Sequence, residues 1–347
     1  MNTTEELFKE FKKGFNKLRN EVIYSGCYHK CDQCSEKIIK AHSIQNNRIL
    51  NKLSLNGEVL YFQLDSVDDE TANAKFELNS IGRRKATTFT GFCGKHDNEI
   101  FKPIEENDYV IGNKEQEFLF AYRALAKEYH AKMSEKNLHD RFIELANTGG
   151  IEKLKKYFPG IRKYQIKEIE EMYRMQKRAI DDSIKTNEYY KNAMNMSLER
   201  KKFNRIYTMV ITFDEEYPIS VSSTFGLERD LNDNIVNNLK DFSKMIKPLM
   251  LTVIPQNGKT YILISCYQKD KELYRGFFKQ LDTKEYEDKK VIISNIILTY
   301  CENFVVSPDA WEKREAEEKR EMMELFNDTI LKIDKKISIN KKVNLFK

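Results

Sequence analysis

Apolar side chains recur every three or four residues in several stretches of this chain, which is the spacing of helices that bury one face. The first stretch covers residues 4–23, with its apolar stripe at Leu7, Phe8, Phe11, Phe15, Leu18 and Val22. Similar patterns cover residues 115–133 and 138–146, and Gly149-Gly150 ends the latter. The sequence therefore predicts an N-terminal amphipathic helix and a helical middle segment.

A longer helix is predicted after Pro159-Gly160, because residues 162–205 contain neither Pro nor Gly. An α-helix of this length spans roughly 60 Å. Helices of this kind usually act as spacers or packing spines. A second interpretation is that this helix joins two copies of the chain in a homo-oligomer.

Shorter stretches rich in β-branched and aromatic residues predict strands. They occupy residues 58–64, 74–78, 86–89, 206–213, 219–224, 249–254 and 260–267. An acidic turn at 65–70 follows the first stretch. Asn257-Gly258 lies between the last two and supplies the positive φ values of a tight hairpin turn, so these two strands are predicted to pair.

The chain ends with three helical patterns, at residues 272–281, 289–303 and 308–328. Ser307 is a candidate N-cap, and Pro308 suits the first helical position. The predicted fold class is α+β, with an N-terminal treble-clef zinc domain that carries a β insertion, a long helical middle segment and a C-terminal α+β domain. The corresponding boundaries are 1–112, 113–205 and 206–347.

Composition places the chain among globular proteins, with 40% hydrophobic residues among 347. No apolar run approaches the roughly 18 residues of a membrane span, so we expect no membrane association. The first residues are charged and lack the apolar core of a signal peptide. Three of the six cysteines fall between residues 27 and 34, which indicates metal binding in a reducing compartment and predicts a cytoplasmic protein.

The net charge of +5 is small, but basic residues gather locally. Arg83, Arg84 and Lys85 form a compact cluster, and residues 151–205 are rich in Lys and Arg. These segments predict a surface that binds the phosphates of nucleic acid. The alternative for each is a solvated helix face or turn.

Two pairs of metal-ligand residues have the spacing of a structural zinc site. Cys31 and Cys34 form a CxxC knuckle, while Cys93 and His96 form a CxxH pair just before a helical pattern at 97–104. A knuckle followed by a pair on a helix is the order of a treble clef. The alternative for the cysteines is burial as small hydrophobes. Cys27, His29 and His42 are near enough in sequence to replace one of the four ligands, and Cys27 is the strongest of them.

Residues 27–105 resemble the HNH, or ββα-metal, endonuclease family, on the CxxC knuckle, Lys40-Ala41-His42-Ser43-Ile44 and the CxxH pair. The resemblance implies that His42 is a general base and that Asp97, directly after His96, binds a catalytic Mg²⁺ or Mn²⁺ ion. Ala41 stands where the family has an acidic residue, and an insertion of about 40 residues separates the two halves.

The resulting hypothesis is a metal-dependent endonuclease that acts on nucleic acid, in the manner of bacterial genome-defence or phage-defence nucleases. The alternatives are an inactive zinc-stabilised protein that binds nucleic acid, and a protein-interaction or sensor component. Dinucleotide-binding, P-loop, nucleophile-elbow and HExxH motifs are absent from the sequence.

Overall fold

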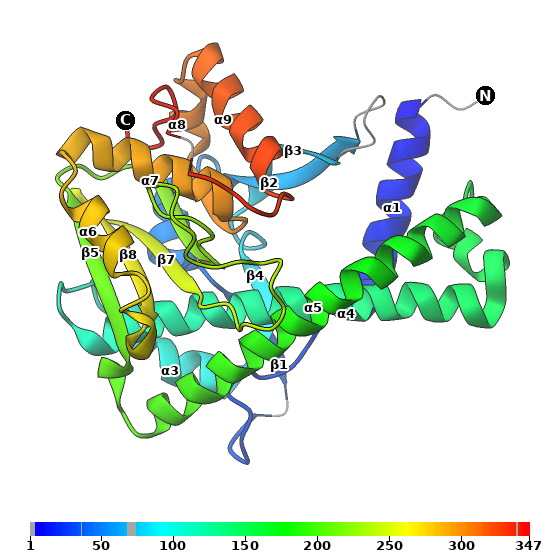
Figure 1. The fold of residues 1–347 in the computed structure, drawn as a ribbon, viewed down its shortest axis with the longest axis horizontal. Helices are drawn as coiled ribbons and strands as arrows, with labels where there is room; N and C mark the ends of the chain where they lie inside the picture. Colours follow the sequence, from blue (N-terminus) through cyan, green and yellow to red (C-terminus); the bar gives the residue numbers. More distant parts are fainter. Residues whose placement is uncertain (1–3, 36, 68–73, 338) are drawn as a thin grey trace.

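The computed structural model describes residues 4–35, 37–67, 74–337 and 339–347. It has the predicted α+β class, with long helices and two sheets (Figure 1). The helical stripe of the first segment is found as α1, Thr4–Val22, although the side chains of Leu7 and Phe8 lie outside the described part. Among the described residues, no helix is both long and apolar enough to cross a lipid bilayer.

The larger sheet has seven antiparallel strands within the described residues, in the order β3-β2-β9-β6-β7-β8-β5. Its strands are β2 (Glu58–Val67), β3 (Ala74–Gly82), β5 (Ile206–Phe213), β6 (Ile219–Phe225), β7 (Leu249–Gln256), β8 (Lys259–Tyr267) and β9 (Phe304–Val306). The predicted hairpin is confirmed: Gln256 pairs with Lys259, and Asn257 and Gly258 have φ values of 52° and 75°. Part of the predicted acidic turn at 65–70 lies outside the described residues.

The β2–β3 insertion belongs to this same sheet, although it comes from the predicted N-terminal segment. The short strand β9 pairs with β2 on one side and with β6 on the other. The predicted segments 1–112 and 206–347 therefore share one sheet. Sequence pattern could not show this, because β9 has only three residues and no alternation of its own.

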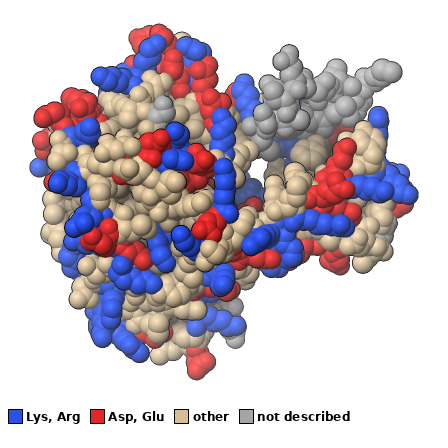
Figure 2. Space-filling view, in the orientation of Figure 1, with Lys and Arg blue, Asp and Glu red and all other residues tan. Residues whose placement is uncertain are grey.

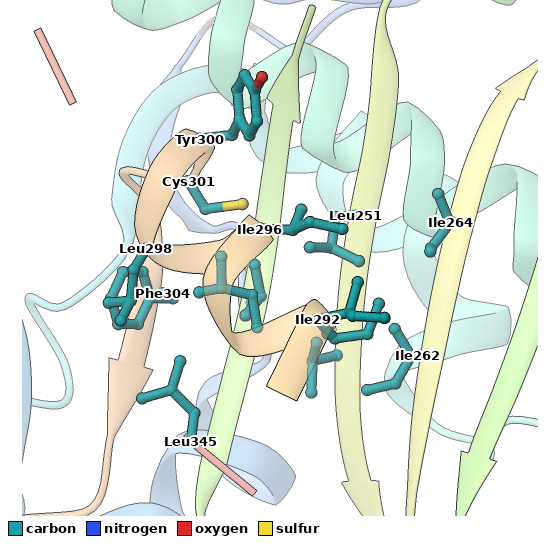
Figure 3. Packing of buried hydrophobic residues seen from close by; sticks show 14 of the residues in the cluster. Leu251, Ile262, Ile264, Ile292, Ile296, Leu298, Tyr300, Cys301, Phe304 and Leu345 are labelled. Atoms are coloured by element: carbon teal, nitrogen blue, oxygen red, sulfur yellow. The ribbon is translucent and has the colours of Figure 1, made fainter. Parts of the chain in front are cut away.

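Helices from the end of the chain cover one face of the sheet. They are α6 (Arg275–Asp282), α7 (Tyr286–Tyr300), α8 (Pro308–Glu312) and α9 (Ala316–Thr329). Ile292 and Ile296 of α7 point toward Leu251, Ile262 and Ile264 of the central strands (Figure 3). Pro308 occupies the first turn of α8 as predicted, but the predicted helix 308–328 is split into α8 and α9.

The opposite face of the sheet packs against α4, Lys114–Lys155, which contacts β5, β6, β7 and β8. This single element merges the two helices predicted between 115 and 146 and continues to Gly150, where the backbone leaves helical geometry. After a connection through Pro159, α5 (Lys163–Glu199) runs back along α4. Beyond the sheet, α1, α4 and α5 form a projecting helical arm with its own apolar core (Figure 1).

Candidate metal centre

A strand–strand–helix unit packs against α4. Strand β1 (Ile38–His42) pairs antiparallel with β4 (Thr88–Cys93), and α3 (Gly94–Glu105) follows β4 directly. Cys93 is the N-cap of α3, and its Sγ accepts a hydrogen bond from the backbone N–H of His96 at 3.5 Å. This ββα unit places the CxxH pair where the strand turns into the helix.

Four ligand atoms converge at this corner, from Cys27, Cys34, Cys93 and His96, and all lie within 4.8 Å of one another. The Nδ1 atom of His96 is 3.3 Å from Cys27 Sγ and 3.5 Å from Cys34 Sγ. We call these four residues the inner group. Three thiols and one imidazole, mostly buried, form a donor set that can hold a metal ion.

The inner group contains three of the four predicted ligands, and Cys27 stands in the place predicted for Cys31. The backbone of residues 26–28 runs beside β4, where Gly26 N donates to Thr90 O and Tyr28 N to Gly91 O, at 3.1 and 2.7 Å. This pairing buries the Cys27 thiol next to Cys93. Cys31 begins a surface turn and is exposed.

A second set of ligand atoms, the outer group, comes from His29, Cys31 and His96, again within 4.8 Å of one another. Cys31 Sγ is 3.5 Å from His96 Nε2. His96 thus belongs to both groups, with a different ring nitrogen toward each. Within the described part of the chain, these two groups are the ones that gather three or more potential metal ligands.

The inner thiols differ in how readily they lose a proton. Burial opposes ionisation of Cys93, but hydrogen bonds from the His96 backbone and Ser35 lower the pKa of its thiol to about 7. Burial raises the pKa of the Cys27 thiol to about 12. Because thiolates are the ligands of metal ions, binding an ion here must displace the Cys27 proton.

His42 lies at the end of β1, opposite Thr88 at the start of β4. Its Nε2 atom is buried and has no hydrogen-bond partner among the described residues. Burial lowers the pKa of this imidazole. A hydrogen bond with the Arg83 backbone opposes the shift, and so does the Glu105 carboxylate. The cations of Arg123 and Arg83 lower the pKa further. The ring is therefore neutral at pH 7, which is the form that can accept a proton.

Asp97 lies in the first turn of α3 and shares charged neighbours with His42. Burial raises the pKa of Asp97, the Arg123 cation opposes this shift, and the Glu105 carboxylate adds to it. An ion pair joins Arg123 Nη1 and Glu105 Oε1 at 2.6 Å, and the guanidinium lies 4.1 Å from the centre of the Phe101 ring. Neither metal-ligand group of the described residues includes His42 or Asp97.

The predicted basic cluster lies in the turn between β3 and β4, close in the fold to His42. Arg83 donates to the side-chain oxygen of Asn46 at 2.9 Å, whereas Arg84 and Lys85 are exposed. Thr87, which closes the turn, has a φ of 59°, a region that β-branched residues rarely adopt. The side chains of Arg84 and Lys85 are thus open to solvent on this turn.

Comparison of this chain with family models, with curated proteins and with solved structures finds no match. The resemblance to ββα-metal nucleases therefore rests on the CxxC knuckle, the segment around His42 and the CxxH pair of this chain.

Sequence reasoning missed Glu105 and Arg123 as charged neighbours of His42 and Asp97. Arg123 comes from α4, outside the residues that carry the family resemblance, and a lone Arg in an amphipathic helix gives no signal of its own. Its side chain is only 4% exposed, which is unusual for an arginine and marks it once the structure is known.

Proposed function

We propose that this chain is a zinc-stabilised endonuclease of the ββα-metal type, in which His42 is the general base. The observation that carries the proposal is the place of His42 at the end of β1, where its buried Nε2 has no hydrogen-bond partner in the described part of the chain and burial lowers the pKa of the ring. As the general base, this nitrogen would take the proton of the water that attacks a phosphate, which requires that substrate binding open it to that water.

The inner group suits structural zinc. With a Zn–S bond of about 2.3 Å and a Zn–N bond of about 2.0 Å, tetrahedral geometry separates sulfur from nitrogen by about 3.5 Å. The distances from His96 Nδ1 to Cys27 Sγ and Cys34 Sγ, 3.3 and 3.5 Å, match this value. Three thiolates and one imidazole also favour zinc over hard ions such as Mg²⁺.

Asp97 is the residue that would hold a catalytic Mg²⁺ or Mn²⁺ ion. Such ions often take only one or two protein carboxylates and complete their shell with water and substrate phosphate. Bound there, the ion would neutralise charge on the phosphate. Arg84 and Lys85 are exposed on the turn next to His42, and we propose that they bind the phosphates of the flanking nucleic acid.

Cleavage of plasmid DNA and of RNA in Mg²⁺ and in Mn²⁺ tests the proposal. His42→Ala should lower the rate of cleavage at least about 100-fold, because a positioned base contributes on that scale. His139→Ala is the matched control, since His139 is a half-buried histidine that stacks on Tyr173 in the helical arm. Zinc content should be unchanged in both variants. Wild-type rates in His42→Ala would exclude His42 as the base.

A second candidate is a protein that binds nucleic acid without cleaving it. The Arg123–Glu105 ion pair favours it, because the Arg123 cation influences both His42 and Asp97 and disfavours a further cation there. This candidate predicts no cleavage by the wild type and binding that weakens with salt. Removing Arg84 or Lys85 should then reduce the slope of log affinity against log salt by about one each.

A further inference from the structure

The two ring nitrogens of His96 face different thiols. Nδ1 lies 3.3 Å from Cys27 Sγ, inside the inner group, while Nε2 lies 3.5 Å from Cys31 Sγ. The second distance also matches the sulfur–nitrogen separation of about 3.5 Å at a tetrahedral zinc-class ion. His96 can therefore serve an ion on each side of its ring.

His29 lies on the same side of the His96 ring as Cys31. Its ring lies 4.9 Å from that of His96, centre to centre, at an interplanar angle of 88°. Its Nδ1 is 3.4 Å from the side-chain oxygen of Asn195 on α5. Metal-binding histidines commonly place one ring nitrogen on such an acceptor and leave the other for the ion.

The contacts of Asn195 fix which of its atoms faces His29. Its Nδ2 donates to Tyr28 O at 3.0 Å, and its Oδ1 accepts from the Tyr122 hydroxyl at 2.6 Å. The oxygen therefore faces His29, and the His29 proton is on Nδ1. This leaves Nε2 of His29 with a free lone pair, the form that binds a metal ion.

We propose that the outer group is a second metal site, in which His29 Nε2, Cys31 Sγ and His96 Nε2 hold an ion of the zinc class. The inference rests on the zinc site of the proposed function and not on cleavage. When both sites are filled, His96 bridges them as an imidazolate, and its ring proton and that of the Cys31 thiol pass to solvent. Three protein ligands leave a fourth position for water or another donor.

The two sites differ in access to solvent. Cys27 and Cys93 of the inner group are buried, whereas Cys31 is exposed and His29 is only partly buried. The outer ion is accordingly the one that exchanges readily with chelators. The inner ion would be held by Cys27 and Cys34 from the segment before β1, by Cys93 at the end of β4 and by His96 of α3, and it should stay bound longer.

Metal stoichiometry of the full-length protein tests the second site. Protein loaded with Zn²⁺ and dialysed against micromolar free Zn²⁺ should contain two ions per chain by plasma mass spectrometry. His29→Ala and Cys31→Ser should each contain one. Cys31 is exposed, so its replacement by Ser should leave folding intact, and the ion that remains reports an intact inner site.

One ion per chain in the wild type would overturn the proposal, whether or not Cys31→Ser retains that ion. Absence of zinc would overturn the inner site as well, while the cleavage assay reports on His42 separately. Titration with Co²⁺ gives a second measurement: two phases of thiolate absorption are expected in the wild type, and Cys31→Ser should remove only the second. A single phase that is identical in both proteins would contradict the proposal.

Discussion

His130 of α4 is buried against β4, and its Nε2 lies 3.3 Å from the backbone N of Thr90, which donates to it. Burial lowers the pKa of this imidazole to about 4, and the Lys127 cation adds to the shift. The unfolded chain has a His pKa of about 6.5, so it binds more protons than the folded chain between these values. The folded chain keeps His130 neutral, and the resulting contribution to the free energy of unfolding is fully present above pH 6.5. This contribution is lost as the pH falls toward 4.

The expected loss is about 3 kcal/mol at full protonation, from about 1.4 kcal/mol per pKa unit. Urea unfolding of the wild type and of His130→Gln at pH 7 and pH 4.5 measures it. The drop in the free energy of unfolding between the two pH values should be smaller in the variant. Equal drops in both proteins would show that His130 does not contribute.

At the same scale, the inner group shows what sequence could and could not predict. Cys34, Cys93 and His96 were identified from spacing alone, because a knuckle and a helix N-terminus are local structures. The choice between Cys27 and Cys31 depends on residues 26–28 running beside β4, a contact between segments more than 60 residues apart. Spacing carries no information about such a contact.

At the scale of elements, α1 docks on the turn after α4 through Gly14. A Cβ atom at Gly14 would lie 1.8 Å from the carbonyl oxygen of Tyr157, so α1 approaches this backbone as only glycine allows. Gly14→Ala should therefore destabilise the helical arm, although alanine by itself favours a helix by about 1 kcal/mol.

Limited proteolysis of the arm and thermal unfolding measure the effect of Gly14→Ala. Gly160→Ala is the matched control, because a Cβ atom there meets nothing within 4 Å. Faster cleavage of Gly14→Ala than of Gly160→Ala is expected. A Gly14→Ala protein more stable than the wild type would mean that α1 does not dock at this place.

Elements with strong local signals were predicted well from sequence. The β7–β8 hairpin follows from Asn257-Gly258, and the break between α4 and α5 follows from Pro159. Arg314 lies in the break between α8 and α9 and donates to the carbonyl oxygens of Asn344 and Leu345 at 2.7 and 3.0 Å. That interaction joins distant parts of the chain and has no local signature.

At the scale of the whole molecule, Asn303 joins the ββα unit to the large sheet. Its buried side-chain nitrogen donates to Ser43 Oγ at 2.9 Å and to Ser222 O on β6 at 2.7 Å. Ser43 directly follows His42, so this contact ties the candidate base to the sheet.

Asn303→Ala leaves buried polar atoms without partners and should lower the free energy of unfolding by about 1–3 kcal/mol. Denaturant unfolding measures this change, and Asn192→Ala on the exposed face of α5 gives the effect of removing an amide outside the junction. If nuclease activity is found, Asn303→Ala should also reduce it. Unchanged stability in Asn303→Ala would show that the junction does not couple the two parts.

Positive and negative side chains are mixed over most of the face that Figure 2 shows, so the charge pattern there does not single out one kind of partner. On α5, for example, Lys177 and Asp181 form an ion pair at 3.1 Å. Met175, Tyr189 and Met196 of α5 are exposed. The homo-oligomer predicted through this helix stays a prediction.

Anomalous diffraction at the zinc edge, from crystals of the zinc-loaded protein, tests the metal centre most directly. The inner group predicts an ion bonded to the sulfur atoms of Cys27, Cys34 and Cys93 and to Nδ1 of His96, with zinc–sulfur bonds of about 2.3 Å. An ion bonded to Cys31 in place of Cys27, or no zinc peak among these four residues, would contradict the assignment.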